Sequence, residues 1–132
     1  MRWGRRALEQ AVEAASDAPS RAQALYDLGL FHDNNSREGE ALPCYEAALA
    51  AGLTGETRAP CLAWLASSLF KMSSPAEARQ RLIEARELAT DAELRRFLTG
   101  LERRLVRRSG AIELRPYAGS LPTSLVTPEG LS

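Results

Sequence analysis

Leucine and alanine recur along the chain at spacings of three and four residues, with polar and charged residues between them. Leu62, Leu65 and Leu69, for example, fall on one face of a helix. The strict alternation typical of strands is nearly absent. The pattern predicts six helices with short joints, as in antiparallel helical hairpins. The expected helices span about 3–17, 21–34, 37–51, 57–72, 75–89 and 91–108.

Sequence signals for helix ends support these boundaries. Three helix starts resemble a capping box, in which a hydroxyl accepts from a backbone N–H and a carboxylate or amide reaches back. The three candidates are Ser20 to Gln23, Ser74 to Glu77 and Thr90 to Glu93. Helix stops are predicted at 17–19, Gly52 and Gly110. Beyond Ser109 prolines and glycines interrupt the chain, so 109–132 is predicted to be a flexible tail, with an extended piece at 111–114 if something pairs with it.

The apolar pattern occurs twice. When 21–51 is moved on by 37 residues it falls on 58–88, and several residues coincide. The coinciding pairs are Arg21/Arg58, Ala22/Ala59, Leu25/Leu62, Leu28/Leu65, Ser36/Ser73, Glu40/Glu77, Ala41/Ala78 and Ala48/Ala85. Such a repeat predicts stacked helix pairs, because no single unit can bury its apolar face alone. The predicted packing stripes are Leu25, Leu28 and His32; Ala41, Tyr45 and Ala48; Leu62, Leu65 and Leu69; Ala78, Leu82 and Ala85; and Leu94, Phe97 and Leu101.

The first copy resembles a tetratricopeptide repeat. The matching residues are Leu25, Leu28, Gly29 and His32, followed by Ala41, Tyr45 and Ala48. The second copy is a degenerate version. The first and sixth helices resemble half units, so the resemblance covers about residues 5–105. It implies an all-α fold: a right-handed superhelical stack of antiparallel helix pairs over 1–108, followed by the tail at 109–132.

The resemblance also implies a function. Known members bind peptides or partner domains on a groove lined by the first helix of each pair and generally have no chemistry of their own. Projected onto this sequence, the groove positions are Gln23, Tyr26, Asp27, Leu30, Asp33, Asn34, Ala63, Trp64, Ser67, Phe70, Lys71, Arg95, Thr99 and Arg103. Trp64 and Phe70 are off the leucine stripe of their helix, so we expect a partly exposed aromatic patch there.

Composition narrows the partners. The 132 residues include 17 basic and 17 acidic ones, and a formal net charge of zero does not favour nucleic acid or an anionic membrane. The first residues lack the apolar run that a signal peptide requires. No apolar stretch of the sequence is long enough to span a bilayer. Arginine greatly outnumbers the single lysine, Lys71, which is typical of a GC-rich genome. We therefore expect a cytoplasmic protein, bacterial in style.

Residues for catalysis or metal binding are few. The one histidine, His32, precedes Asp33, but adjacent helical residues do not face each other. The cysteines, Cys44 and Cys61, are far apart and are predicted to be reduced, packed thiols. One histidine and two separated cysteines do not make a typical zinc site, and no glycine-rich phosphate loop is present. The prediction is a protein that is not an enzyme and needs no cofactor or metal.

Other interpretations remain open. The sixth helix carries Arg95, Arg96, Arg103, Arg104, Arg107 and Arg108, which could serve an adaptor for nucleic acid or an acidic partner. A small enzyme or ligand-binding protein would instead need a pocket near His32, Asp33 and Trp64. Truncated end units leave apolar helix faces to be covered, so a homodimer is a further alternative. The tail could also dock in the groove through Leu121, Leu125 and Val126.

Overall fold

The computed structural model describes residues 4–113, with side chains up to Arg108. The described part contains six α-helices and one 3-10 turn. These are α1 (Arg5–Ala14), α2 (Ala18–Asn34), α3 (Glu38–Ala50), η1 (Gly55–Thr57), α4 (Arg58–Lys71), α5 (Pro75–Leu88) and α6 (Ala92–Glu113). The chain divides into two compact units between Leu98 and Thr99, and each is described by itself. The predicted tail beyond Glu113 lies outside the described residues.

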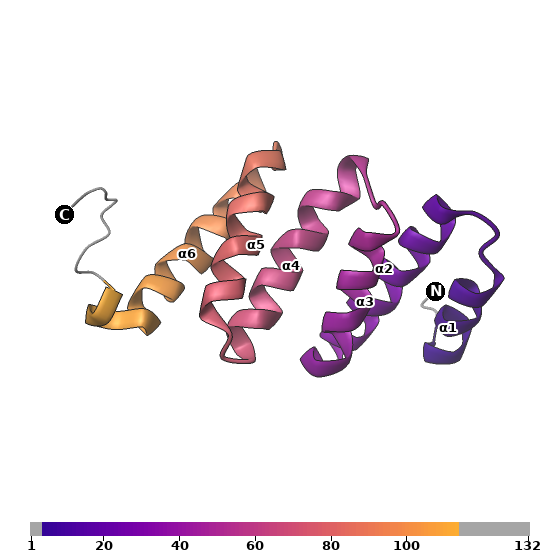
Figure 1. The fold of residues 1–132 in the computed structure, drawn as a ribbon, viewed down its shortest axis with the longest axis horizontal. Helices are drawn as coiled ribbons and strands as arrows, with labels where there is room; N and C mark the ends of the chain where they lie inside the picture. Colours follow the sequence, from indigo (N-terminus) through magenta and orange to yellow (C-terminus); the bar gives the residue numbers. More distant parts are fainter. Residues whose placement is uncertain (1–3, 114–132) are drawn as a thin grey trace. The chain divides into compact units, whose positions relative to one another are not determined.

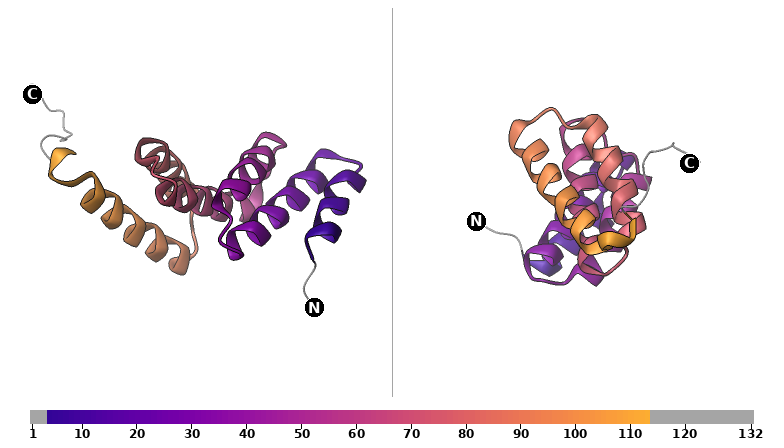
Figure 2. Two further views of the ribbon diagram at one scale, coloured as in Figure 1. Left: turned by 90° about the horizontal axis from the view of Figure 1, so that it is seen from below. Right: turned by 90° about the vertical axis from the view of Figure 1, so that its left-hand side faces the viewer.

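The first unit is built from helical hairpins. α2 packs against α3 and α4 against α5, as the ribbon shows, while α1 packs on α2 and α3 on α4 (Figure 1). The two hairpins are also side by side in the further views (Figure 2). No strand occurs among residues 4–113, and every helix there is too short or too polar to cross a membrane. The prediction of an all-α helical repeat is confirmed.

The 37-residue repeat is also a repeat of backbone geometry. Ser36 and Ser73 end α2 and α4 with positive φ angles of 59° and 64°. One residue later, the N–H of Arg37 donates to His32 O at 2.8 Å, and that of Ser74 donates to Leu69 O at 2.9 Å. These bonds satisfy carbonyls that a helix end leaves without partners. Both hairpins therefore have the same turn geometry, with a serine at positive φ followed by a backbone hydrogen bond to the end of the first helix.

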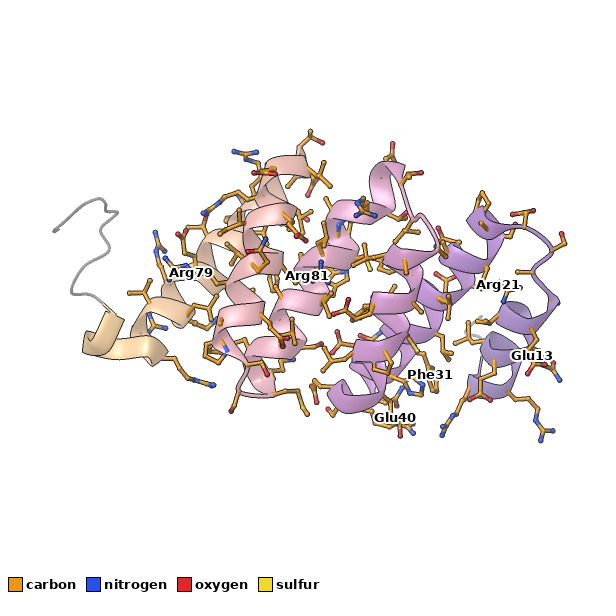
Figure 3. The ribbon with its side chains drawn as sticks, in the orientation of Figure 1. Glu13, Arg21, Phe31, Glu40, Arg79 and Arg81 are labelled. Atoms are coloured by element: carbon orange, nitrogen blue, oxygen red, sulfur yellow. The ribbon has the colours of Figure 1, made fainter. Side chains whose placement is uncertain are left out.

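The second helices supply small and large apolar residues to the core. Ala41, Tyr45 and Ala48 are fully buried, and so are Ala78 and Ala85, while Leu82 is 2% exposed. These stripes, and the one on α4, are confirmed. Arg81 connects α5 to α3: its Nη2 lies 2.8 Å from Glu46 Oε1, and the side chain can be followed in Figure 3. A partly exposed pair of this kind stabilises by roughly 0.2–1 kcal/mol.

The predicted boundary between the first two helices is wrong. α1 ends at Ala14 and α2 begins at Ala18, because Asp17 is the N-cap, and its Oδ1 accepts from the N–H of Ser20 at 2.8 Å. Pro19 fits the first turn, where its missing N–H has no partner to lose. The N-cap of α2 is therefore Asp17, two residues before Pro19, and not Ser20 as predicted.

Other helix ends differ in the same way. Asp91, not Thr90, caps α6, since its Oδ2 accepts from the N–H of Leu94 at 2.9 Å. Ser74 is the N-cap of α5 as predicted, but its side chain forms no capping hydrogen bond. α6 continues through Gly110 to Glu113, so 111–113 is helical and not extended. A glycine costs a helix interior only about 1 kcal/mol, which does not force an end.

Two predicted packing stripes need correction. In α6 the buried leucines are Leu98, Leu101 and Leu105, whereas Leu94 and Phe97 are half-buried. In α2, Leu28 and His32 are buried but Leu25 is only half-buried. The stripe on α6 is thus shifted around the helix, which leaves Leu94 and Phe97 partly accessible.

Candidate functional site

An aromatic residue from each of three helices forms a continuous row. Trp64 Nε1 on α4 donates a hydrogen bond to the hydroxyl of Tyr26 on α2 at 3.1 Å. On its other side, the Trp64 ring meets that of Phe97 on α6, with centroids 4.9 Å apart and planes at 66°. This edge-to-face arrangement is favoured between aromatic rings. We call Tyr26, Trp64 and Phe97 the aromatic row.

The aromatic row is partly covered and partly accessible. Tyr26 is buried, and burial raises the pKa of its hydroxyl above the ordinary value, so the hydroxyl stays neutral. Trp64 and Phe97 are half-buried. The indole N–H has a partner within the chain, and the exposed parts of these two rings are apolar. The accessible end of the row therefore offers apolar contact.

A hollow of about 810 Å³ lies beside that end of the row. Trp64 and Pro60 of α4, Leu88 at the end of α5, and Leu94 and Phe97 of α6 contribute apolar lining. The volume falls within the range typical of ligand sites, roughly 300–1,000 Å³. We call this cavity the α4–α6 hollow; it lies entirely within the first unit.

A second, shallower hollow of about 480 Å³ lies between α1 and α2. It is lined by small residues such as Ala11 and Ala24 together with Gln23 and Asp27. The amide of Gln23 donates to Asp27 Oδ1 at 3.0 Å, so these two polar residues bind each other. This α1–α2 hollow has no aromatic lining.

The structure places the predicted groove residues in different settings. Those that are exposed are Gln23, Asn34, Lys71, Arg95 and Arg103. Those that are half-buried are Asp27, Leu30, Asp33, Trp64, Ser67, Phe70 and Thr99. Tyr26 is 7% exposed and joins the row, while Ala63 is fully buried and is not available to a partner. Only Trp64 of this set lines the α4–α6 hollow, and Gln23 and Asp27 line the other.

Trp64 and Phe70, where a partly exposed aromatic patch was expected, are both half-buried. Six residues apart on one helix, the two point about 120° from each other. The ring against Trp64 is Phe97, which the sequence pattern had assigned to packing. The spacing of the three aromatic residues could have indicated this contact. Phe97 follows Trp64 by 33 residues, close to one repeat, and Tyr26 precedes Trp64 by 38 residues.

Asp33 and Lys71 are among the polar groove candidates that have partners inside the chain. Asp33 Oδ2 accepts a hydrogen bond from the hydroxyl of Tyr45 at 2.9 Å. Lys71 Nζ lies 3.5 Å from Glu38 Oε2 at the surface. The Tyr45 contact gives Asp33 a structural role, and the neighbouring carboxylate offsets the charge that Lys71 would present to a partner.

His32 is buried in the last turn of α2, where its ring centroid lies 5.7 Å from that of Phe31; Phe31 and Glu40 are labelled in Figure 3. The Nδ1 of His32 lies 3.1 Å from Glu40 Oε1, although the two groups are not aligned as a hydrogen bond. Burial is the main cause that lowers the pKa of His32; Arg5 and Arg37 lower it further, and Glu40 opposes them.

His32, Asp33 and Trp64 do not share either of the two hollows described above. Each of the three contacts a different residue, namely Glu40, Tyr45 and Tyr26 respectively. Neither His32 nor Asp33 lines either hollow. Of the three, only Trp64 lines the α4–α6 hollow.

The two cysteines, Cys44 and Cys61, are free thiols. Cys61 is buried, and burial raises the pKa of its thiol to about 12; Cys44 is half-buried with its pKa also raised by burial. Both stay protonated at neutral pH and are weak nucleophiles. Within residues 4–113, no group of three or more His, Cys, Asp and Glu is placed to hold a metal ion. The arginines of α6, from Arg95 to Arg108, are exposed.

The comparisons with known proteins agree with the helical repeat. A family model described as tetratrico peptide repeat matches residues 22–110, which is most of the described chain. Neither the curated proteins nor the solved structures give a match. The matched range begins within α2 and contains the rest of both hairpins, whose turns repeat after 37 residues. The chain belongs to the tetratricopeptide repeat family.

Proposed function

We propose that this chain is a non-enzymatic interaction module that works in the cytoplasm. It binds a peptide or partner protein on the first helix of each helical pair. The binding surface comprises the exposed parts of α2 and α4 and of α6 up to Leu98, with the α4–α6 hollow as its deepest point. The observation that carries the proposal is the aromatic row ending at this hollow. Family membership supports the same class of function.

The physical basis is the contribution of aromatic residues to interfaces. A few buried aromatic anchors supply most of the binding energy of a protein interface, provided that they are held in place before binding. Trp64 is held by Tyr26 on one side and Phe97 on the other, so little side-chain entropy remains to be lost. Leu88 adds apolar surface at the edge of the hollow, since it is 48% exposed.

A capture experiment with matched variants tests the proposal. Leu88 and Ile83 are both on α5 and are similarly exposed, at 48% and 45%, but only Leu88 lines the hollow. The tagged wild type, Leu88→Asp and Ile83→Asp would be cross-linked in a lysate of the source organism. Circular dichroism would first establish that the three have equal helicity.

The expected result is a protein captured by the wild type and by Ile83→Asp and lost from Leu88→Asp. Equal capture by all three variants would place the interaction elsewhere and contradict the proposal. If nuclease treatment also abolished capture by the wild type, that result would favour the arginines of α6 as a nucleic-acid surface. Capture of the chain alone would favour self-association.

A further inference from the structure

We infer that the α4–α6 hollow binds a cationic peptide segment, in which an arginine or lysine stands next to a large apolar residue. The inference rests on the proposed function and adds the chemistry of the ligand. The basis of this inference is the lining of the hollow, which combines aromatic and aliphatic side chains with acidic residues.

The charged residues that line the hollow are all acidic: Glu56, Asp91 and Glu93. The whole chain is balanced, with 17 basic and 17 acidic residues, so this is a local excess. None of the three takes part in an ion pair among the described residues. A ligand cation would therefore meet carboxylates whose charge is not offset by a salt bridge.

Helix capping explains only part of this acidic set. Asp91 caps α6, and Glu93 is in its first turn, where the helix dipole favours negative charge. Glu56 is in η1, directly ahead of α4, where the helix dipole also favours an acid, but it makes no capping hydrogen bond and lines the same hollow. The nearest arginines in sequence, Arg58 and Arg95, donate to backbone carbonyls.

The rings favour the same ligand. A guanidinium or ammonium group is attracted to the face of tryptophan or phenylalanine, and the attraction increases when water is excluded. Trp64 and Phe97 present their rings at 66° to each other on the wall of the hollow. Leu88 and Leu94 offer apolar contact for a neighbouring side chain of the peptide. An acidic peptide would gain the apolar contact but would be repelled by the carboxylates.

The test uses two defined peptides of equal length and opposite charge. The probes are acetyl-Gly-Arg-Leu-Arg-Leu-Gly-amide and the same peptide with both arginines replaced by glutamate. Each is titrated into the full ¹⁵N-labelled chain, and amide shifts are followed by NMR. The inference predicts saturable shifts at the lining residues with the basic peptide, weakened by added salt, and none with the acidic one.

Charge variants locate the interaction. Glu56→Gln with Glu93→Gln should weaken binding of the basic peptide by about tenfold or more, since two carboxylates are neutralised without loss of shape. The control is Glu77→Gln with Glu87→Gln, two exposed acids of α5 that do not line the hollow, which should leave the affinity unchanged. Glu56→Lys with Glu93→Lys should transfer binding to the acidic peptide.

Several outcomes would overturn the inference. It fails if neither peptide shifts the lining residues, if both bind equally, or if both glutamine pairs have the same effect. If partner capture still depends on Leu88 in any of these cases, the proposed function stands and only the ligand chemistry is wrong. If the captured partner is also insensitive to Leu88→Asp, the two proposals fail together.

Discussion

The ring of Tyr45 lies against the bare Cα of Gly29, where α3 packs on α2. A Cβ atom at Gly29 would stand 2.6 Å from Tyr45 Cε1 and 2.7 Å from Cδ1, well inside van der Waals contact. The ring has little room to retreat, because Tyr45 is fully buried and its hydroxyl is bonded to Asp33. Glycine at this position therefore sets how closely the two helices of the first hairpin approach.

Gly29→Ala is expected to destabilise the protein. The substitution gains about 1 kcal/mol in helix propensity, but overpacking a rigid core costs typically 1–3 kcal/mol, so we expect a net loss of up to about 2 kcal/mol. The measurement is urea unfolding followed by circular dichroism, comparing midpoints at constant slope.

Gly100→Ala is the matched control. Gly100 is also within a helix, but a Cβ atom there would meet nothing within 4 Å. This variant should gain stability by about 0.5–1 kcal/mol from helix propensity alone. If both alanine variants are stabilised, the close contact at Gly29 is not limiting; if both are destabilised, the effect is not specific to Tyr45.

Much of the fold was predictable from the sequence because each second helix buries small residues around one large residue. Ala41, Tyr45 and Ala48 show this pattern clearly, and packing follows it. Helix starts were less predictable, since Asp17 and Ser20 are both good caps and local sequence does not decide between them. The proline after Asp17 favoured the earlier start.

The site was predicted less completely than the fold. Tyr26 and Trp64 were placed on the first helices by repeat position, and they are in direct contact. The contact of Phe97 with Trp64 was missed because Leu94, Phe97 and Leu101 have helical spacing and were therefore assigned to the core. The leucines that are buried in the structure, Leu98, Leu101 and Leu105, also have helical spacing. Spacing alone cannot decide which of two adjacent stripes faces the core. The acidic lining was also invisible, because Glu56 and Asp91 are brought together only by the tertiary fold.

The serine at each hairpin turn provides a second stability prediction. Ser36 and Ser73 have left-handed backbone angles, which cost a residue with a Cβ atom about 1–2 kcal/mol relative to its preferred regions. Glycine adopts these angles freely but loses more entropy on folding. We expect Ser36→Gly and Ser73→Gly each to raise the free energy of unfolding by up to about 1 kcal/mol.

Alanine at the same positions separates conformation from side-chain loss. Ser36→Ala keeps the Cβ atom and should give no gain in thermal or urea stability. Equal stabilisation by alanine and glycine would show that the positive φ angle is not the cause. The turns lie near each other, as the Lys71–Glu38 contact at 3.5 Å shows, so the double variant would measure whether the two glycine effects are coupled.

His32 gives the protein a predicted dependence on acid. Burial lowers the pKa of His32 below its ordinary value of 6.5 in the folded state, so the unfolded chain binds a proton more readily. The stabilising contribution is therefore complete above about pH 6.5 and is lost as the pH falls through the folded pKa. NMR titration reads the pKa directly, because the chain has one histidine.

Glu40→Gln tests the electrostatic part of this balance. The Glu40 carboxylate, 3.1 Å from the ring of His32, favours the protonated form, so removing its charge should lower the pKa of His32 further. Glu77→Gln, at the equivalent repeat position of α5, should leave that pKa unchanged. A pKa above 6.5 in the wild type would show that the carboxylate outweighs burial. In that case stability would instead decrease as the pH rises through the folded pKa.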